Sequence, residues 1–128
     1  MSILINKNQY FTLEIKGYYR RDEQGTIISF KKSSDGNVSL ICRYTGRDFD
    51  TMSKIIEESS IINSVNGKPL LRSGIFTKLI VLNFFKDINI ISENENSTIV
   101  IDKDIINKIH YDIIKYMAQK WLELTNGI

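Results

Sequence analysis

The stretch Ser73–Ile101, SGIFTKLIVLNFFKDINIISENENSTIVI, decides the fold of this chain. Its first half, up to Lys86, is apolar on nearly every side when it is drawn as a helix, and Ser73 suits a helix start. Two β-branched runs follow, Ile88–Ser92 and Thr98–Ile101, separated by an acidic, asparagine-rich turn. The stretch therefore predicts a buried helix followed by a β-hairpin.

A helix followed by a hairpin also ends a winged-helix unit, in which the helix reads the major groove of DNA. The predicted helix has few polar side chains, and two glutamates in the predicted wing tip would be repelled by phosphates. A winged-helix-like shape stays open, but this pattern disfavours recognition of duplex DNA. The polar side chains of the helix are mainly Thr77, Lys78, Asn83 and Lys86.

Three earlier segments have the alternating pattern of half-buried β-strands. They are Tyr10–Arg20, Thr26–Lys32 and Asn37–Tyr44, and their inward positions are mostly aromatic or β-branched. The Asp-Gly pair at 35–36 is a strong hairpin signal, so the three segments predict an antiparallel meander. The apolar opening Met1–Ile5 suits a further edge strand.

An amphipathic helix is predicted between these strands and the buried helix. Apolar residues recur at helical spacing over Asp50–Asn63, and Asp48 or Asp50 suits the N-cap. Val65–Pro69 is predicted as a loop because it holds Asn-Gly and the single proline. Pro69 also suits the start of a short helical turn over 70–72.

A long last helix is predicted from Asp102 or Asp104 to about residue 125. Its apolar stripe is wider than one packing contact needs. The stripe therefore also suits a homodimer contact through Ile105 and Tyr116.

Strands followed by helices indicate an α+β fold, and 128 residues suit one domain spanning 1–128. Residues 1–45 are predicted to form the antiparallel sheet. Residues 48–128 are predicted to form the helical part, with the hairpin at 88–101 and a long C-terminal helix packed across the other elements. The expected core residues are Leu79, Phe84, Phe85, Ile113 and Trp121.

No motif in the sequence indicates enzymatic chemistry. Cys42 and His110 are the only residues of their kinds, which argues against a disulfide framework and against a zinc site. The glycines are scattered and form no phosphate-binding loop. Two aspartate pairs stand before predicted helices, where capping is favoured over Mg²⁺ binding. We expect no enzymatic activity and no cofactor; a Cys42–His110 dyad, or His110 as a buried general base, is the disfavoured alternative.

The composition is that of an ordinary globular protein, with 42% hydrophobic and 25% charged residues and a net charge of +2. The sequence shows no signal peptide and no apolar run of about 18 residues, so a cytoplasmic location without a membrane span is expected. Isoleucine, asparagine and lysine, which have AT-rich codons, are abundant. This bias favours an origin in a phage or another mobile element.

The outward face of the predicted N-terminal sheet is the candidate binding surface. Aromatic rings alternate there with cations, and two isoleucines interrupt the polar pattern. Tyrosine and arginine dominate protein interfaces, whereas the same pattern also suits single-stranded nucleic acid, whose bases stack on aromatic rings. A face that is merely solvated or covered by helices is the third interpretation. The candidate residues are Tyr10, Lys16, Tyr18, Arg20, Ile27, Lys31, Ile41 and Arg43.

From these features we expect a non-enzymatic regulatory protein that acts through protein–protein contact, such as a mobile-element inhibitor of host machinery. The alternative is a module that binds single-stranded DNA or RNA through the basic sheet face. The net charge of +2 supports nucleic-acid binding only weakly.

Overall fold

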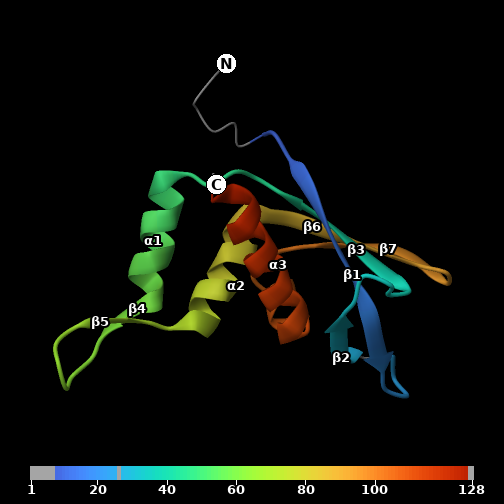
Figure 1. The fold of residues 1–128 in the computed structure, drawn as a ribbon, viewed down its shortest axis with the longest axis horizontal. Coiled ribbons are helices and arrows are strands. Elements are labelled where there is room, and N and C mark those ends of the chain that lie inside the picture. Colours follow the sequence, from blue (N-terminus) through green and yellow to red (C-terminus); the bar gives the residue numbers. More distant parts are fainter. Residues whose placement is uncertain (1–7, 26, 127–128) are drawn as a thin grey trace.

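The computed structural model describes residues 8–25 and 27–126, and the strand expected at Met1–Ile5 lies outside this range. Within the described residues the chain forms a five-stranded antiparallel sheet, a separate two-stranded hairpin, three α-helices and one 3₁₀ helix (Figure 1). The α+β class is confirmed. The strands of the large sheet are β1 (Phe11–Arg21), β2 (Ile27–Lys32), β3 (Val38–Tyr44), β6 (Phe85–Ser92) and β7 (Glu95–Val100). The other elements are α1 (Phe49–Ser59), β4 (Ser60–Ile62), β5 (Pro69–Leu71), α2 (Ser73–Phe84), η1 (Ile105–Lys108) and α3 (Tyr111–Thr125).

The three N-terminal strands are present and antiparallel, but their order is β2-β1-β3, with the first strand in the middle. The N-terminal part of β1 pairs with β3 and its C-terminal part with β2, and the two pairings meet at Gly17. The connection 33–37 therefore crosses β1. Gly36 lies directly against the backbone of Gly17, and the Ser33 N–H donates to the Lys16 carbonyl at 2.9 Å. The Asp-Gly pair thus supplies the glycine for a crossing and not for a hairpin turn.

The predicted hairpin is confirmed as β6 and β7, which pair from Asp87–Val100 to Ser92–Glu95. It joins the N-terminal strands, because β6 also pairs along the whole length of β3. The preceding helix α2 is buried in its second half, where Ile80, Val81 and Phe84 are all covered. Ser73 is the first helical residue and not the cap, which is Arg72.

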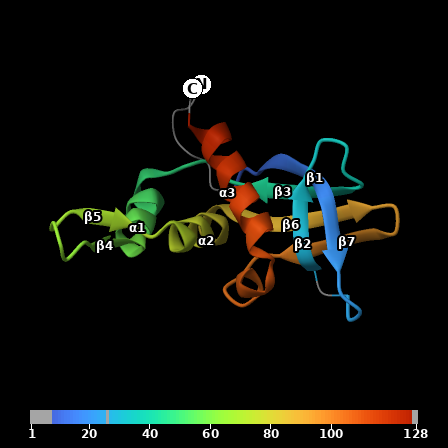
Figure 2. The ribbon, with the colours of Figure 1, turned by 60° about the horizontal axis from the view of Figure 1, so that its bottom comes forward.

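The core lies between the inner face of the sheet and helices α2 and α3 (Figure 2). Phe84, Phe85, Ile113 and Trp121 are buried as expected, and Leu79 is half-buried against them. The Trp121 ring stacks on Phe84 with 4.4 Å between centroids. Its indole N–H donates to the Thr45 carbonyl at 3.0 Å, which ties α3 to the end of β3.

The predicted long last helix is broken between η1 and α3. The break is at Ile109 and His110, where ψ is 136° and 135°, and the Nδ1 of His110 accepts a hydrogen bond from the Asp112 N–H at 3.2 Å. His110 is therefore the N-cap of α3 and does not lie on the apolar face of one continuous helix. Ile106 on η1 and Ile113 on α3 are both buried, so the broken geometry still covers the apolar stripe.

The predicted first helix ends earlier than expected, and a hairpin follows it. Residues 60–62 form β4 and pair with β5, so the helix over 50–63 and the helical turn over 70–72 are both corrected. The helical spacing of apolar residues continues through Ile62, which explains the overlong helix. Pro69 stands at the first position of β5, where a strand tolerates proline.

Together, α1, β4 and β5 form a projecting arm, residues 49–71. Figure 2 shows the β4–β5 hairpin and α1 on one side of α2 and the large sheet on the other. The arm is attached to the rest of the protein where α1 packs against α2. Among the helices of the described residues, none combines the length and the apolar character needed to cross a membrane.

Candidate functional site

The outward face of the large sheet is left open by the described helices, which lie on its other side (Figure 1). Along β3, inward residues are buried and the residues between them are more exposed. Glu14, Ile41 and Asn89 form one cross-strand row of the outward face, since they are register partners. Seven of the eight candidate residues follow the outward pattern; they are Tyr10, Lys16, Tyr18, Arg20, Lys31, Ile41 and Arg43.

Ile27 is the exception, because it packs against the core on the inner face. Arg20 pairs with Ser29 whereas Arg21 pairs with Ile27, so one residue of β2 is skipped in the ladder. Such a bulge shifts the side chains beyond it to the opposite face. The expectation that Ile27 faces outward is therefore wrong, and Ile41 is the remaining candidate isoleucine on the face.

Tyr10 is the centre of a cluster of cations at one end of this face. The Arg43 guanidinium lies 5.8 Å and the Lys86 ammonium 5.0 Å from the centroid of its ring. Arg43 also donates from Nε to both carboxylate oxygens of Asp87, at 2.9 and 3.1 Å, and from its Nη2. This contact holds the pKa of the Asp87 carboxyl below its ordinary value. The charge of Arg43 is thus largely used within the protein.

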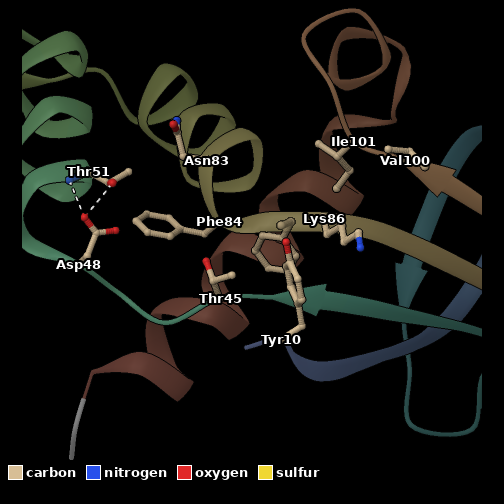
Figure 3. Close-up of a pocket in the computed structure, with 10 residues that line it drawn as sticks. Tyr10, Thr45, Asp48, Thr51, Asn83, Phe84, Lys86, Val100 and Ile101 are labelled. Carbon is tan, nitrogen blue, oxygen red and sulfur yellow. Dashed lines mark hydrogen bonds between the residues drawn. The ribbon is translucent and has the colours of Figure 1, made fainter. Parts of the chain in front are cut away.

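Beside Tyr10 lies a cleft of about 270 Å³ (Figure 3). The Asp48 carboxylate on its α1 side accepts from the Thr51 N–H at 3.0 Å and from the Thr51 hydroxyl at 2.8 Å. The predicted capping role of Asp48 is confirmed, and both of these hydrogen bonds go to its Oδ2. The cleft is lined by Tyr10, Thr45, Asp48, Thr51, Asn83, Phe84, Phe85, Lys86, Val100 and Ile101.

Cys42 and His110 each have a structural role, one as a buried core residue and the other as a helix cap. Cys42 is fully buried on the inner face of β3, and its thiol faces the Leu40 carbonyl at 3.9 Å. Burial raises the pKa of this thiol to about 12. His110 is occupied as a helix cap. Within residues 8–25 and 27–126, no three His, Cys, Asp or Glu side chains lie together as metal ligands would.

The Cys42 thiol is expected to be unreactive in the folded protein, because only the thiolate is nucleophilic. Addition of Ellman's reagent at pH 8 is expected to give a reaction slower than that of a free thiol by at least about a hundredfold. The same measurement in denaturant is expected to give one thiol at the ordinary rate. A fast reaction of the folded protein would mean that β3 is accessible from its inner face.

The arm carries apolar surface in a segment whose sequence pattern predicts the end of a helix and a loop. Val65 at its tip is 92% exposed, Phe49 at the start of α1 is 83% exposed and Ile62 on β4 is 68% exposed. A signal for the hairpin exists in the sequence, because Asn66-Gly67 stands between two apolar pairs and Gly67 has a φ of +69°. The other exposed apolar residues on or beside the arm are Ile56, Ile61, Leu70, Leu71 and Ile75.

The base of the arm is fixed by Arg72. Its Nη2 donates to the Glu58 carbonyl at 2.6 Å and its Nε to the Ser59 carbonyl at 3.3 Å. The Arg72 N–H also donates to the Ser59 carbonyl, at 2.8 Å. These bonds satisfy carbonyls at the C-terminal end of α1, which have no partner within the helix. The hairpin is therefore held at a defined position on α1, and its apolar side chains are presented in a fixed arrangement.

Comparison of the chain with protein-family models, with curated proteins and with solved structures gives no match. The functional argument therefore rests on the two surfaces, the sheet face and the arm.

Proposed function

We propose that this chain is a non-enzymatic protein that acts by binding another protein, and that the arm is its main contact surface. The observation that carries the proposal is the exposed apolar surface of the arm. Single exposed apolar residues are common in soluble proteins, but the two paired strands of this hairpin hold four of them, Ile61, Ile62, Leu70 and Leu71, which is typical of an interaction site. Among the described residues, the three most exposed large apolar side chains all belong to the arm; they are Phe49, Ile62 and Val65.

Burial of the apolar side chains of the arm by a partner would contribute favourable free energy to binding. Burial of one large aliphatic side chain contributes about 1.5–3 kcal/mol relative to exposure. Ile62, Val65 and Leu70 together thus offer several kcal/mol to a partner that wraps around the hairpin, since Leu70 pairs with Ile61 and so lies on the face opposite to Ile62. A two-stranded hairpin is also marginally stable by itself, so a partner that covers it would stabilise it as well.

The strands of the arm add a second mode of contact. β4 and β5 pair only with each other in the described residues, so each presents an outer edge. An extended segment of a partner can add to such an edge through main-chain hydrogen bonds. Main-chain pairing combined with apolar pockets on alternate residues is a common mode of peptide recognition, and it suits a regulatory or inhibitory protein.

A homodimer through the C-terminal helix receives less support. Tyr116 packs against Phe30, with 6.0 Å between ring centroids, and Ile105 is half-buried beneath the sheet. These side chains are used within the chain, so a second copy gains less from them than from the arm.

Nucleic-acid binding by the sheet face is also less well supported. Asp87 neutralises Arg43, and Glu14 stands in the middle of the face beside Ile41. Phosphate binding requires an excess of unpaired cations. Ile91 and Val100, which are both exposed on this face, fit a secondary protein contact better.

The test uses two double variants with the same chemistry on different surfaces. Ile62→Asp/Val65→Asp changes the arm, whereas Ile91→Asp/Val100→Asp changes the sheet face. All four side chains are exposed, so both variants are expected to fold with the melting temperature of the wild type within a few degrees. Each is used as bait in nuclease-treated extract of the cells that express the chain.

The arm variant is expected to lose the captured protein by at least about tenfold, because two buried apolar contacts are replaced by charges. The sheet variant is expected to retain it. Loss with the sheet variant alone would transfer the site to the predicted face. Binding of a single-stranded oligonucleotide to the purified protein that falls steeply with salt and vanishes in Lys16→Glu/Lys31→Glu, at two exposed positions of the sheet face, would favour the alternative function.

A further inference from the structure

An apolar cavity, separate from the cleft beside Tyr10, lies on the inner side of the sheet beneath η1 and the start of α3. Its volume is about 300 Å³, at the lower end of the range of small-molecule sites. Its lining includes residues of β2 and β7, and Figure 2 shows these strands on the far side of α2 from the arm. The lining residues are Tyr19, Arg21, Ile27, Leu40, Ile88, Ile90, Ile99, Ile105, Lys108, Ile109, His110 and Ile113.

The interior of this cavity is aliphatic. Leu40, Ile88 and Ile113 form a fully buried floor, and half-buried isoleucines from β2, β7 and η1 form the walls. The bulge in β2 places Ile27 in this wall. The lining residues with polar side chains are Tyr19, Arg21, Lys108 and His110. A site filled with ordered water needs several buried polar partners, and the aliphatic interior of this cavity does not provide them.

The polar residues of the cavity favour an anion. Lys108 has no ion-pair partner among the described residues, and no Asp or Glu is among the lining residues. The Asp112 carboxylate lies 3.8 Å from His110 Nδ1, so Lys108 supplies the unpaired positive charge and His110 only a hydrogen-bond donor. His110 Nδ1 accepts a backbone hydrogen bond, so in the neutral ring Nε2 carries the proton and donates. Arg21 lines another side of the cavity. Its Nη2 donates to the Glu95 carboxylate at 3.0 Å and to the Tyr19 hydroxyl at 3.2 Å.

We propose that this cavity binds one alkyl chain that ends in a carboxylate, such as a medium-chain fatty acid. The chain would lie against the isoleucines, and the carboxylate would meet Lys108 and His110. At roughly 30 Å³ for each water- or methylene-sized group, the space corresponds to about ten carbons. No residue of the arm lines this cavity, so the proposed fatty-acid site is separate from the proposed protein-binding surface.

The test measures binding of octanoate, decanoate, dodecanoate and tetradecanoate by calorimetry, below the concentrations at which they form micelles. Affinity is expected to rise about tenfold from octanoate to decanoate, and then to level off for dodecanoate and tetradecanoate because the cavity is full. Decanol is expected to bind more weakly than decanoate, and decyltrimethylammonium more weakly still. An affinity that rises without limit, or does not depend on the head group, would overturn the proposal.

Two variants locate the site. Ile99→Trp fills the cavity from β7 and is expected to reduce decanoate binding at least tenfold, with folding checked by circular dichroism. Lys108→Glu, at an exposed position, is expected to weaken decanoate and leave decanol unchanged, whereas Lys103→Glu outside the cavity changes neither. Unchanged decanoate binding by folded Ile99→Trp, or equal effects of the two lysine variants, would contradict the assignment. Ile62→Asp/Val65→Asp is expected to bind decanoate normally, so failure of the protein-binding proposal is scored separately.

Discussion

Gly36→Ala is expected to lower the free energy of unfolding by about 3 kcal/mol or more, a large effect for a single methyl group. A Cβ at this position would overlap the backbone nitrogen, oxygen and Cα of Gly17. Backbone atoms cannot rotate away as a flexible side chain can. The loop 33–37 would have to lift from β1, and the flanking strands on either side of β1 would separate with it.

Urea unfolding followed by circular dichroism measures this effect. Gly74→Ala is the matched control, because a Cβ on Gly74 in the first turn of α2 meets no atom within 4 Å. That control is expected to be neutral or stabilising by up to about 1 kcal/mol, since alanine favours the helix. Equal stability of the Gly36→Ala protein and the wild type would show that the connection does not cross β1 at Gly17.

Trp121→Ala is expected to destabilise the protein by about 3–5 kcal/mol. The side chain is completely buried, stacks on Phe84 and donates to the Thr45 carbonyl, and the Arg47 guanidinium lies 5.1 Å from its ring. Its loss would leave a large cavity where α2, α3 and the end of β3 meet. Folding would be compromised at physiological temperature if the total stability is of ordinary size.

Thermal unfolding provides the measurement, and Leu124→Ala on the same helix provides the control. Leu124 is half exposed, so its truncation is expected to cost about 1 kcal/mol or less. Comparable melting temperatures for Trp121→Ala and Leu124→Ala would show that α3 does not pack on α2 through this ring.

The sequence allowed the prediction of those elements whose signals are local. The apolar run before Lys86 and the β-branched runs after it define α2, β6 and β7, and the alternation in Tyr10–Arg20 defines β1. Each pattern has one period, so it determines an element without reference to distant residues. The core residues followed from the same patterns.

The strand order and the arm depend on other information. The order β2-β1-β3 is fixed by contact between Gly36 and Gly17, which local hairpin chemistry does not reveal. In the arm, the helical spacing of apolar residues continues to Ile62, and the turn signal Asn66-Gly67 follows shortly after it. Residues 60–62 form a strand of the hairpin that this turn closes, and not the end of the helix. At Ile27 a single skipped residue reverses the face that alternation predicts.

The candidate site was predicted in part. Seven residues of the sheet face have the predicted orientation, and the pairing of Arg43 with Asp87 could not be foreseen because the two are 44 residues apart. That pairing neutralises one of the four candidate cations on which the nucleic-acid interpretation rests, Lys16, Arg20, Lys31 and Arg43. The most exposed apolar surface lies instead on the arm, in a segment predicted as helix end and loop.

The most direct test of the proposed function is photo-crosslinking from the tip of the arm. A benzoylphenylalanine residue is incorporated in place of Val65, and a second protein carries it in place of Lys103, which is exposed outside the arm. The proposal predicts a light-dependent covalent adduct between the first protein and one cellular protein, and no such adduct from the second. A third protein carries the same residue in place of Val100 on the sheet face. Equal adducts from positions 65 and 103 would contradict the proposal that the arm binds the partner. An adduct from position 100 and none from position 65 would contradict it as well.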